Sequence, residues 1–204
     1  RAGAANAGAE AAHGRFLHFL DDDDLLLPGG LGALVAAAGE GEVVYGRVEA
    51  TRWSGTGEGS LRVPFRSFAE PFDATALLLE NFIPLNAPLL PRAAFLAAGG
   101  FDEALGRFED WDLFLRLSRS LPFRLVDVPV AEYRVFPGHF IDDPDGARTQ
   151  EPFRVEVVRK HAALYAPEEV SRLLLHVKRE VLPREVRRET AAAEALVARA
   201  GEAL

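Results

Sequence analysis

Short apolar runs separated by glycine, proline and polar clusters continue through the first 140 residues and predict an α/β order. Residues 15–20 (RFLHFL) and 42–48 (EVVYGRV) have the length and the aromatic or β-branched content of buried strands. Residues 51–60 are polar and glycine-rich, which indicates a loop or a hairpin. Helical spacing is predicted over three stretches, 2–12, 31–38 and 73–82, the last with Asp73 as its N-cap.

Prolines and one strongly amphipathic stretch mark the middle of the chain. The segment IPLNAPLLP, residues 83–91, is expected to be extended or irregular because proline disfavours regular pairing and helical neighbours. A short helix over 92–98 should end at the glycine pair that follows it. Residues 101–108 read as a loop, and residues 123–135 predict one or two strands around Pro129.

The segment 109–120 (EDWDLFLRLSRS) has the periodicity of a half-buried helix. Its apolar side chains fall on one side, which should face the core: Trp111, Phe114, Leu115 and Leu117. Two acids at its start suit the positive end of a helix dipole. This is the clearest helix prediction in the chain.

The pattern changes after residue 135. Residues 136–150 are rich in glycine, proline and aspartate, which is typical of a loop, and helical spacing returns from residue 151 onward. Pro167 and Pro183 fall where first helical turns are expected. We therefore expect an α/β domain over 1–140 and a linker with a helical extension over 141–204.

Composition narrows the classes of function. The 204 residues are 49% hydrophobic and 26% charged, as in globular proteins. The net charge of −8 argues against nucleic-acid binding, which needs a basic face. Cysteine is absent, which excludes disulfides and thiolate metal sites. No apolar run reaches the ~18 residues that span a bilayer, and no export signal opens the sequence, so a cytoplasmic location is expected.

Four consecutive aspartates, Asp21 to Asp24, follow the first predicted strand. In an extended segment Asp21 and Asp23 would point the same way and could hold one Mg²⁺ or Mn²⁺ ion, while Asp22 or Asp24 would face elsewhere. Ligands of open α/β sheets bind at the carboxyl ends of strands, where this run lies. A solvated turn or a helix cap is the alternative explanation.

Other candidate groups are weaker on their own. Glu109 and Asp110 are explained by the helix dipole alone, and the chemical alternative is a general base that takes a proton from a hydroxyl group. The pair Tyr133-Arg134 and the loop histidine His139 are also ordinary when taken singly.

Taken together, these pieces resemble glycosyltransferase family 2, whose fold is GT-A. The resemblance covers about residues 1–140 and depends on the order of several motifs: Asn6-Ala7-Gly8, HGRFLHFLDDDDLLLP, VVYG, Asn81, Arg92, GGFDEALGRFEDWDLFLRLS and VPVAEYRV. It implies a Rossmann-like mixed sheet flanked by helices, and an enzyme that transfers a sugar from a nucleoside-diphosphate sugar, expected to be UDP-linked, to a hydroxyl of a glycan, lipid or protein acceptor.

The resemblance also assigns the aspartates. Asp23 would be the direct ligand of Mn²⁺ or Mg²⁺ and Asp24 would support the metal. Asp21 would reach the ribose or a metal-bound water. Asp22 belongs to the same substrate-facing run, and its loss is expected to cost least. Many family members have a histidine two residues after the Tyr-Arg pair. Phe136 occupies that place here, so His139 is assigned to the metal through a different loop path.

The remaining assignments concern the acceptor side. Asp110 would deprotonate the acceptor and give inversion at the anomeric carbon, and Glu109 would orient it or contact the acceptor. Asn6 and Arg134 are assigned to substrate binding. Trp111 is assigned to substrate binding too, although its spacing favours a place in the core.

Two further expectations concern the N-terminal part of this domain and the C-terminal tail. The family fold begins with strands and a nucleotide-base pocket that have no counterpart here, and methionine is absent, so we expect the domain to be incomplete at its N-terminus. The tail after residue 150 has mixed charge, which favours packing or homo-oligomerisation over a membrane helix, although peripheral contact with the inner face of the membrane stays open.

Two other classes of protein remain as alternatives. A sugar-phosphate nucleotidyltransferase also uses carboxylates and Mg²⁺ on an α/β sheet. A GT-A-like domain that only binds partners would be non-catalytic, but both acidic motifs are present at their expected positions.

Overall fold

Strand β3 (Val43–Ser54) is the centre of the sheet, and every other strand pairs with it directly or through one neighbour. The computed structural model describes residues 1–54, 60–138 and 146–161, which belong to a compact unit from Arg1 to His161. The strand order is β1-β5-β3-β6-β2, and β4 pairs with β3 outside this path. The other strands are β1 (Phe16–Leu17), β2 (Leu25–Leu26), β4 (Leu61–Phe68), β5 (Pro88–Pro91) and β6 (Phe123–Val135).

The sheet is mixed, as the sequence predicts. Strand β3 runs parallel to β6 and antiparallel to β4 and β5. Its apolar start is buried because both faces of the sheet are covered there. Gly46 is required at the crossing with β6, since a Cβ atom at this position would lie 2.1 Å from a methyl carbon of Val130. The close contact between the two longest strands therefore depends on one missing side chain.

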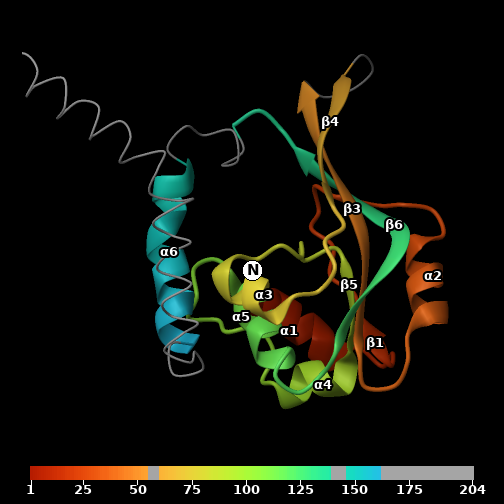
Figure 1. Ribbon diagram of the computed structural model, residues 1–204, viewed down its shortest axis with the longest axis vertical. Coiled ribbons are helices and arrows are strands. Elements are labelled where there is room, and N and C mark those ends of the chain that lie inside the picture. Colours follow the sequence, from red (N-terminus) through yellow and green to blue (C-terminus); the bar gives the residue numbers. More distant parts are fainter. Residues whose placement is uncertain (55–59, 139–145, 162–204) are drawn as a thin grey trace, which may run out of the picture. The chain divides into compact units, whose positions relative to one another are not determined.

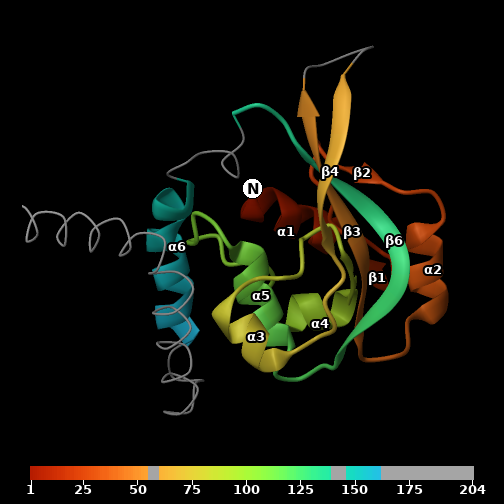
Figure 2. The same ribbon diagram turned by 45° about the horizontal axis from the view of Figure 1, so that its top comes forward.

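Helices cover both faces of the sheet (Figures 1 and 2). Helix α2 (Gly30–Ala37) lies on one face against β6 and β3. The opposite face carries α1 (Ala2–Ala11), α3 (Ala74–Leu79), α4 (Arg92–Ala97) and α5 (Glu109–Leu117), and α6 (Gly146–His161) packs against α5. The expected mixed sheet flanked by helices is thus confirmed.

Several local predictions are confirmed by their physical details. The carboxylate of Asp73 accepts hydrogen bonds from the backbone N–H groups of Thr75 (2.7 Å) and Ala76 (3.0 Å), so it is the N-cap of α3. The core-facing side of α5 is also as predicted, and all four of its apolar residues are buried: Trp111, Phe114, Leu115 and Leu117.

Other elements differ from the prediction. Of the loop or hairpin expected over residues 51–60, the structure has the hairpin: β3 extends to Ser54 and pairs antiparallel with β4, a strand that the sequence pattern did not predict. The first predicted strand contracts to Phe16–Leu17. Strand β6 continues through Pro129, which sits at a register shift opposite Arg47, where its missing N–H group is tolerated. Helix α6 begins at Gly146, earlier than expected.

The tail predictions cannot be compared with the fold. Pro167, Pro183 and the rest of the helical extension lie outside the described residues. The division into a domain over 1–140 and an extension over 141–204 therefore stays a prediction. Within the described part of the chain, no helix has both the length and the apolar character needed to cross a membrane.

A buried carboxylate joins α5 to α6. Asp112 has no exposed surface, and it accepts hydrogen bonds from Arg116 (2.8 and 3.0 Å) and forms contacts with Lys160 (2.7 Å) and His161 (2.8 Å) of α6. Arg116 also donates to the carbonyl oxygens of Ala98 (2.5 Å) and Gly100 (2.7 Å). Burial by itself would raise the pKa of Asp112, but these hydrogen bonds and positive charges hold it well below its usual range.

Replacing Asp112 should therefore destabilise the unit strongly. We expect Asp112→Ala to lower the free energy of unfolding by about 3–5 kcal/mol, because Arg116 and His161 would lose their buried partner. The matched control is Glu70→Gln, which breaks an exposed ion pair with Arg66 and should cost at most about 1 kcal/mol. Urea unfolding of both variants measures the difference, and equal losses would contradict the structural role of Asp112.

Candidate active site

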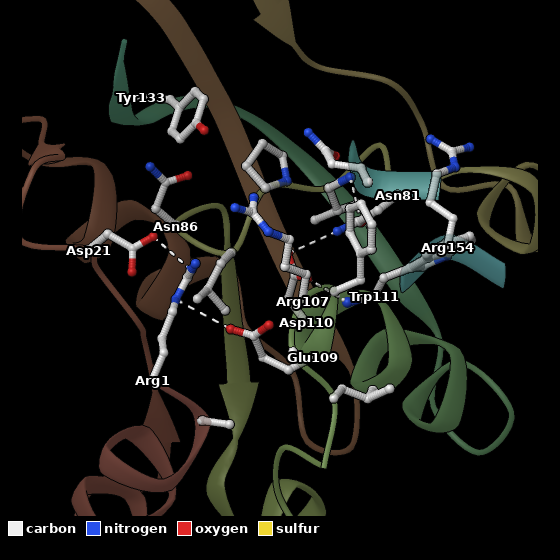
Figure 3. Close-up of a pocket in the computed structure, with 18 of the residues that line it drawn as sticks. Arg1, Asp21, Asn81, Asn86, Arg107, Glu109, Asp110, Trp111, Tyr133 and Arg154 are labelled. Atoms are coloured by element: carbon white, nitrogen blue, oxygen red, sulfur yellow. Dashed lines mark hydrogen bonds and ion pairs between the residues drawn. The ribbon is translucent and has the colours of Figure 1, made fainter. Parts of the chain in front are cut away.

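One cavity of about 670 Å³ is lined by four of the acidic residues that the sequence singles out: Asp21, Asp24, Glu109 and Asp110. Asp22 and Asp23 do not line it. Its wall combines the loop after β1, the segment between α3 and β5, the start of α5, strand β6 and helix α6. Figure 3 shows Asp21 on one side, Glu109 and Asp110 at the base, and Arg154 on the other side. Segments far apart in the sequence therefore meet at one site.

Three of the four aspartates form a cluster. Carboxylate oxygens of Asp21, Asp23 and Asp24 lie within 4.8 Å of one another. The run is a turn and not an extended strand, because the N–H group of Asp24 donates to the carbonyl oxygen of Asp21 (3.1 Å). This turn brings Asp24 into the cluster and leaves Asp22 exposed, so the expected alternation of directions holds only in part.

Asp24 is the most firmly held member of the cluster. Its carboxylate accepts one hydrogen bond from the side-chain amide of Asn86 (2.7 Å) and one from the backbone N–H group of Arg134 (2.9 Å). Burial, with a further contribution from the charges of Asp23 and Asp21, nevertheless raises the pKa of Asp24 to about 7. Three carboxylates that repel one another are the oxygen donor set that a hard divalent cation such as Mg²⁺ or Mn²⁺ prefers.

Arg134 shapes the aspartate turn from β6. Its Nε–H group donates to the carbonyl oxygen of Asp23, and its guanidinium group lies over the rings of Trp53 (5.7 Å) and Phe136 (5.3 Å). These contacts give Arg134 a positioning role. Its assignment to substrate binding stays a prediction.

The second acidic group starts α5. The carboxylate of Asp110 accepts hydrogen bonds from the backbone N–H group of Trp111 (2.8 Å) and from the side-chain amide of Asn81 (2.9 Å). Burial, followed by the negative charge of Glu109, raises the pKa of Asp110 to about 6 in spite of these bonds. A carboxylate with such a pKa is a stronger base than an exposed one and is still mostly ionised at neutral pH.

A single arginine connects the two acidic groups. The guanidinium group of Arg1 lies 2.7 Å from the carboxylate of Asp21 and 3.3 Å from that of Glu109 (Figure 3). The aspartate cluster and the start of α5 are therefore within the reach of one side chain. The two acidic groups are thus close enough to act on the same bound substrates.

The remaining assigned residues have mixed positions. Asn6 exchanges hydrogen bonds with the backbone of Phe101 (2.9 Å each) and donates to Glu103 (3.0 Å), so it joins α1 to the loop before α5, and it does not line the cavity. Trp111 is buried and donates to the carbonyl oxygen of Leu77 (2.6 Å), yet it forms part of the cavity wall. His139 lies outside the described residues.

Two asparagines that no sequence pattern marks as functional hold the acids in place. Asn81 and Asn86 both lie in the segment between α3 and β5, one bonded to Asp110 and the other to Asp24. In the sequence they stand out only as two polar residues within the mostly apolar, proline-rich run NFIPLNAPLLP. No local pattern indicates which carboxylate each amide would meet.

Comparison with known proteins agrees with this site. Residues 1–88 match the model of the family described as glycosyl transferase family 2. The match includes the aspartate cluster, Asn81 and Asn86, whereas the Glu109-Asp110 pair lies beyond it. No curated protein matches the sequence.

Solved structures with some likeness include the crystal structure of S. aureus TarS 1–349. It shares 19% identity with this chain, covers 63% of it and has a TM-score of 0.42. This chain spans 38% of the length of that chain. Any activity or substrate of this chain is therefore a proposal.

Two substitutions around Asp110 should move its pKa in opposite directions. Asn81→Ala removes a hydrogen bond that favours the charged form, so the pKa should rise above about 6. Glu109→Gln removes a neighbouring negative charge, so the pKa should fall. Carbon-detected NMR titration of the Asp110 carboxyl measures both shifts, with Asp110→Asn identifying the resonance. Shifts of the same sign would contradict this account of the site.

Proposed function

We propose that this chain carries the catalytic site of a metal-dependent, inverting glycosyltransferase. The observation that supports it best is that Asp21 and Asp24 of the aspartate cluster line the same cavity as Glu109 and Asp110, and that Arg1 contacts both Asp21 and Glu109. Sugar transfer needs charge stabilisation at the leaving group and a base at the attacking hydroxyl. Two separate acidic groups beside one cavity match these two needs.

The aspartate cluster is assigned to the donor side. Asp23 and Asp24 would hold Mn²⁺ or Mg²⁺, and Asp21 would face the nucleotide or a bound water. When bound, the ion supplies neutralisation of the negative charge that develops on the leaving diphosphate. Asn86 and the backbone of Arg134 keep Asp24 in place without cancelling its charge, since both donate from uncharged groups.

Asp110 is assigned as the base. As the acceptor oxygen bonds to the anomeric carbon, the bond from that carbon to the diphosphate oxygen breaks, and its electron pair leaves with the nucleotide. The proton of the acceptor hydroxyl passes to Asp110, whose orientation is set by Asn81 and by the N–H group of Trp111. One direct displacement inverts the anomeric carbon. Glu109 is assigned to orienting the base or contacting the acceptor.

The partners follow from this chemistry. The donor is proposed to be a nucleoside-diphosphate sugar, UDP-linked, and the acceptor a hydroxyl of a glycan, lipid or protein. The family assignment favours this function over a sugar-phosphate nucleotidyltransferase. A cytoplasmic location, contact with the inner face of the membrane and homo-oligomerisation through the tail remain predictions.

Asp110→Asn tests the base and also the alternative of a non-catalytic domain. We expect sugar transfer to fall by at least about a hundredfold, because general base catalysis contributes roughly 10²–10⁴-fold. Binding of UDP in the presence of Mn²⁺ should be unchanged. Radiolabelled sugar transfer and calorimetry measure the two quantities, and transfer at the normal rate would show that Asp110 is not the base.

Asp23→Ala tests the metal assignment. The variant should lose the Mn²⁺-dependent part of UDP binding, because the cluster would lose one of its three carboxylates. Asp22→Ala is the matched control, since this neighbouring aspartate is exposed and outside the cluster, and it should bind nearly as the parent does. Equal affinities of parent and Asp23→Ala at saturating Mn²⁺ would reject the assignment.

A further inference from the structure

Asn86 has an amide group whose two ends face different surroundings. Its side chain is 3% exposed, although it forms part of the cavity wall. Its nitrogen donates to Asp24, and its oxygen has no hydrogen-bond partner among the described residues. Because the amide nitrogen donates to Asp24, the amide oxygen is directed away from that hydrogen bond. Figure 3 shows this amide on the side of the cavity where Asp21 and Tyr133 lie.

A buried amide oxygen without a partner is costly. Leaving such a group unsatisfied costs about 1–3 kcal/mol, so native proteins rarely retain one without a reason. A ligand group that donates a hydrogen bond would satisfy it. The phosphates of a nucleotide cannot do so, because at neutral pH they are essentially acceptors, whereas the hydroxyl groups of a sugar can.

We infer that Asn86 is a binding residue for the transferred sugar, with Oδ1 accepting a hydrogen bond from one of its hydroxyl groups. This inference rests on the proposed function. Its neighbour Asp24 belongs to the cluster assigned to the diphosphate side, and the sugar is the donor-bearing group attached to that diphosphate. The acceptor side is marked by Asp110, which the other asparagine of the segment holds.

Such a contact would also discriminate between nucleoside-diphosphate sugars that carry different sugars. A site that hydrogen-bonds a substrate hydroxyl discriminates against the analogue that lacks it, because the buried oxygen is then left unpaired. Asn86 would therefore have two roles. Its nitrogen positions the carboxylate of Asp24, and its oxygen accepts a hydrogen bond from one hydroxyl group of the sugar.

The two roles are separated by comparing ligands with and without the sugar. Calorimetry at saturating Mn²⁺ measures the affinity of the full chain for UDP and for three sugar nucleotides: UDP-glucose, UDP-galactose and UDP-N-acetylglucosamine. The sugar nucleotide that the parent binds most tightly is then used to test the variants. In Asn86→Leu its affinity should fall about tenfold, while the affinity for UDP should fall less than about threefold. Glu70→Gln, an exposed change outside the cavity wall, should leave both affinities within about twofold.

The outcomes are distinct. Equal losses for UDP and the sugar nucleotide in Asn86→Leu would show that Asn86 acts only through Asp24 and would overturn the inference. Unchanged sugar-nucleotide affinity would also overturn it. If the parent binds neither UDP nor any of the sugar nucleotides, the proposed function itself fails, and the inference fails with it.

A second measurement starts from the parent chain, so its first result does not depend on the folding of a variant. Monodeoxy analogues of the selected sugar nucleotide, each lacking a different hydroxyl, are titrated against the parent. One analogue should bind about tenfold more weakly than the intact ligand, and Asn86→Leu should bind that analogue and the intact ligand equally. Uniform binding of all analogues by the parent would overturn the inference.

Discussion

Mutual repulsion of carboxylates is the constraint on which the rest of this structure depends. Two acidic groups meet at one cavity, which is lined by Asp21 and Asp24 of the aspartate cluster and by Glu109 and Asp110. Burial first, and neighbouring charge second, raise the pKa of Asp24 and of Asp110 above the ordinary range. The fold must hold these acids together while leaving their charge available for a cation and for a proton.

The structure meets this constraint mainly with uncharged donors. Asn86 and the backbone of Arg134 hold Asp24, while Asn81 and the backbone of Trp111 hold Asp110. A lysine or arginine in either asparagine position would neutralise the carboxylate that it held. An amide sets the orientation of a carboxylate and leaves its charge in place, which suits a group that must bind a metal or accept a proton.

Asp112, on the same helix, is held by charged donors and has a lowered pKa. It lies two residues after Asp110, but Arg116, Lys160 and His161 surround it, and its pKa is held well below the usual range. This carboxylate anchors α5 to α6 and to the turn before α5, and so fixes the helix start that presents Asp110. Two aspartates of one helix thus have different roles, and their surroundings determine which role each has.

Most of the elements, and the acids of the site, can be predicted from the amino-acid sequence. Periodicity and capping predicted α3 and α5, and the order of motifs indicated the same family as the model that matches residues 1–88. These features are local, because helix spacing, caps and acidic runs are encoded by neighbouring residues. Three features become visible only in the folded chain: Asp24 joins the cluster, β4 forms, and each asparagine meets one particular carboxylate. Those outcomes depend on distances between residues remote in the chain, such as Asn86 and Asp24, and no local pattern contains such distances.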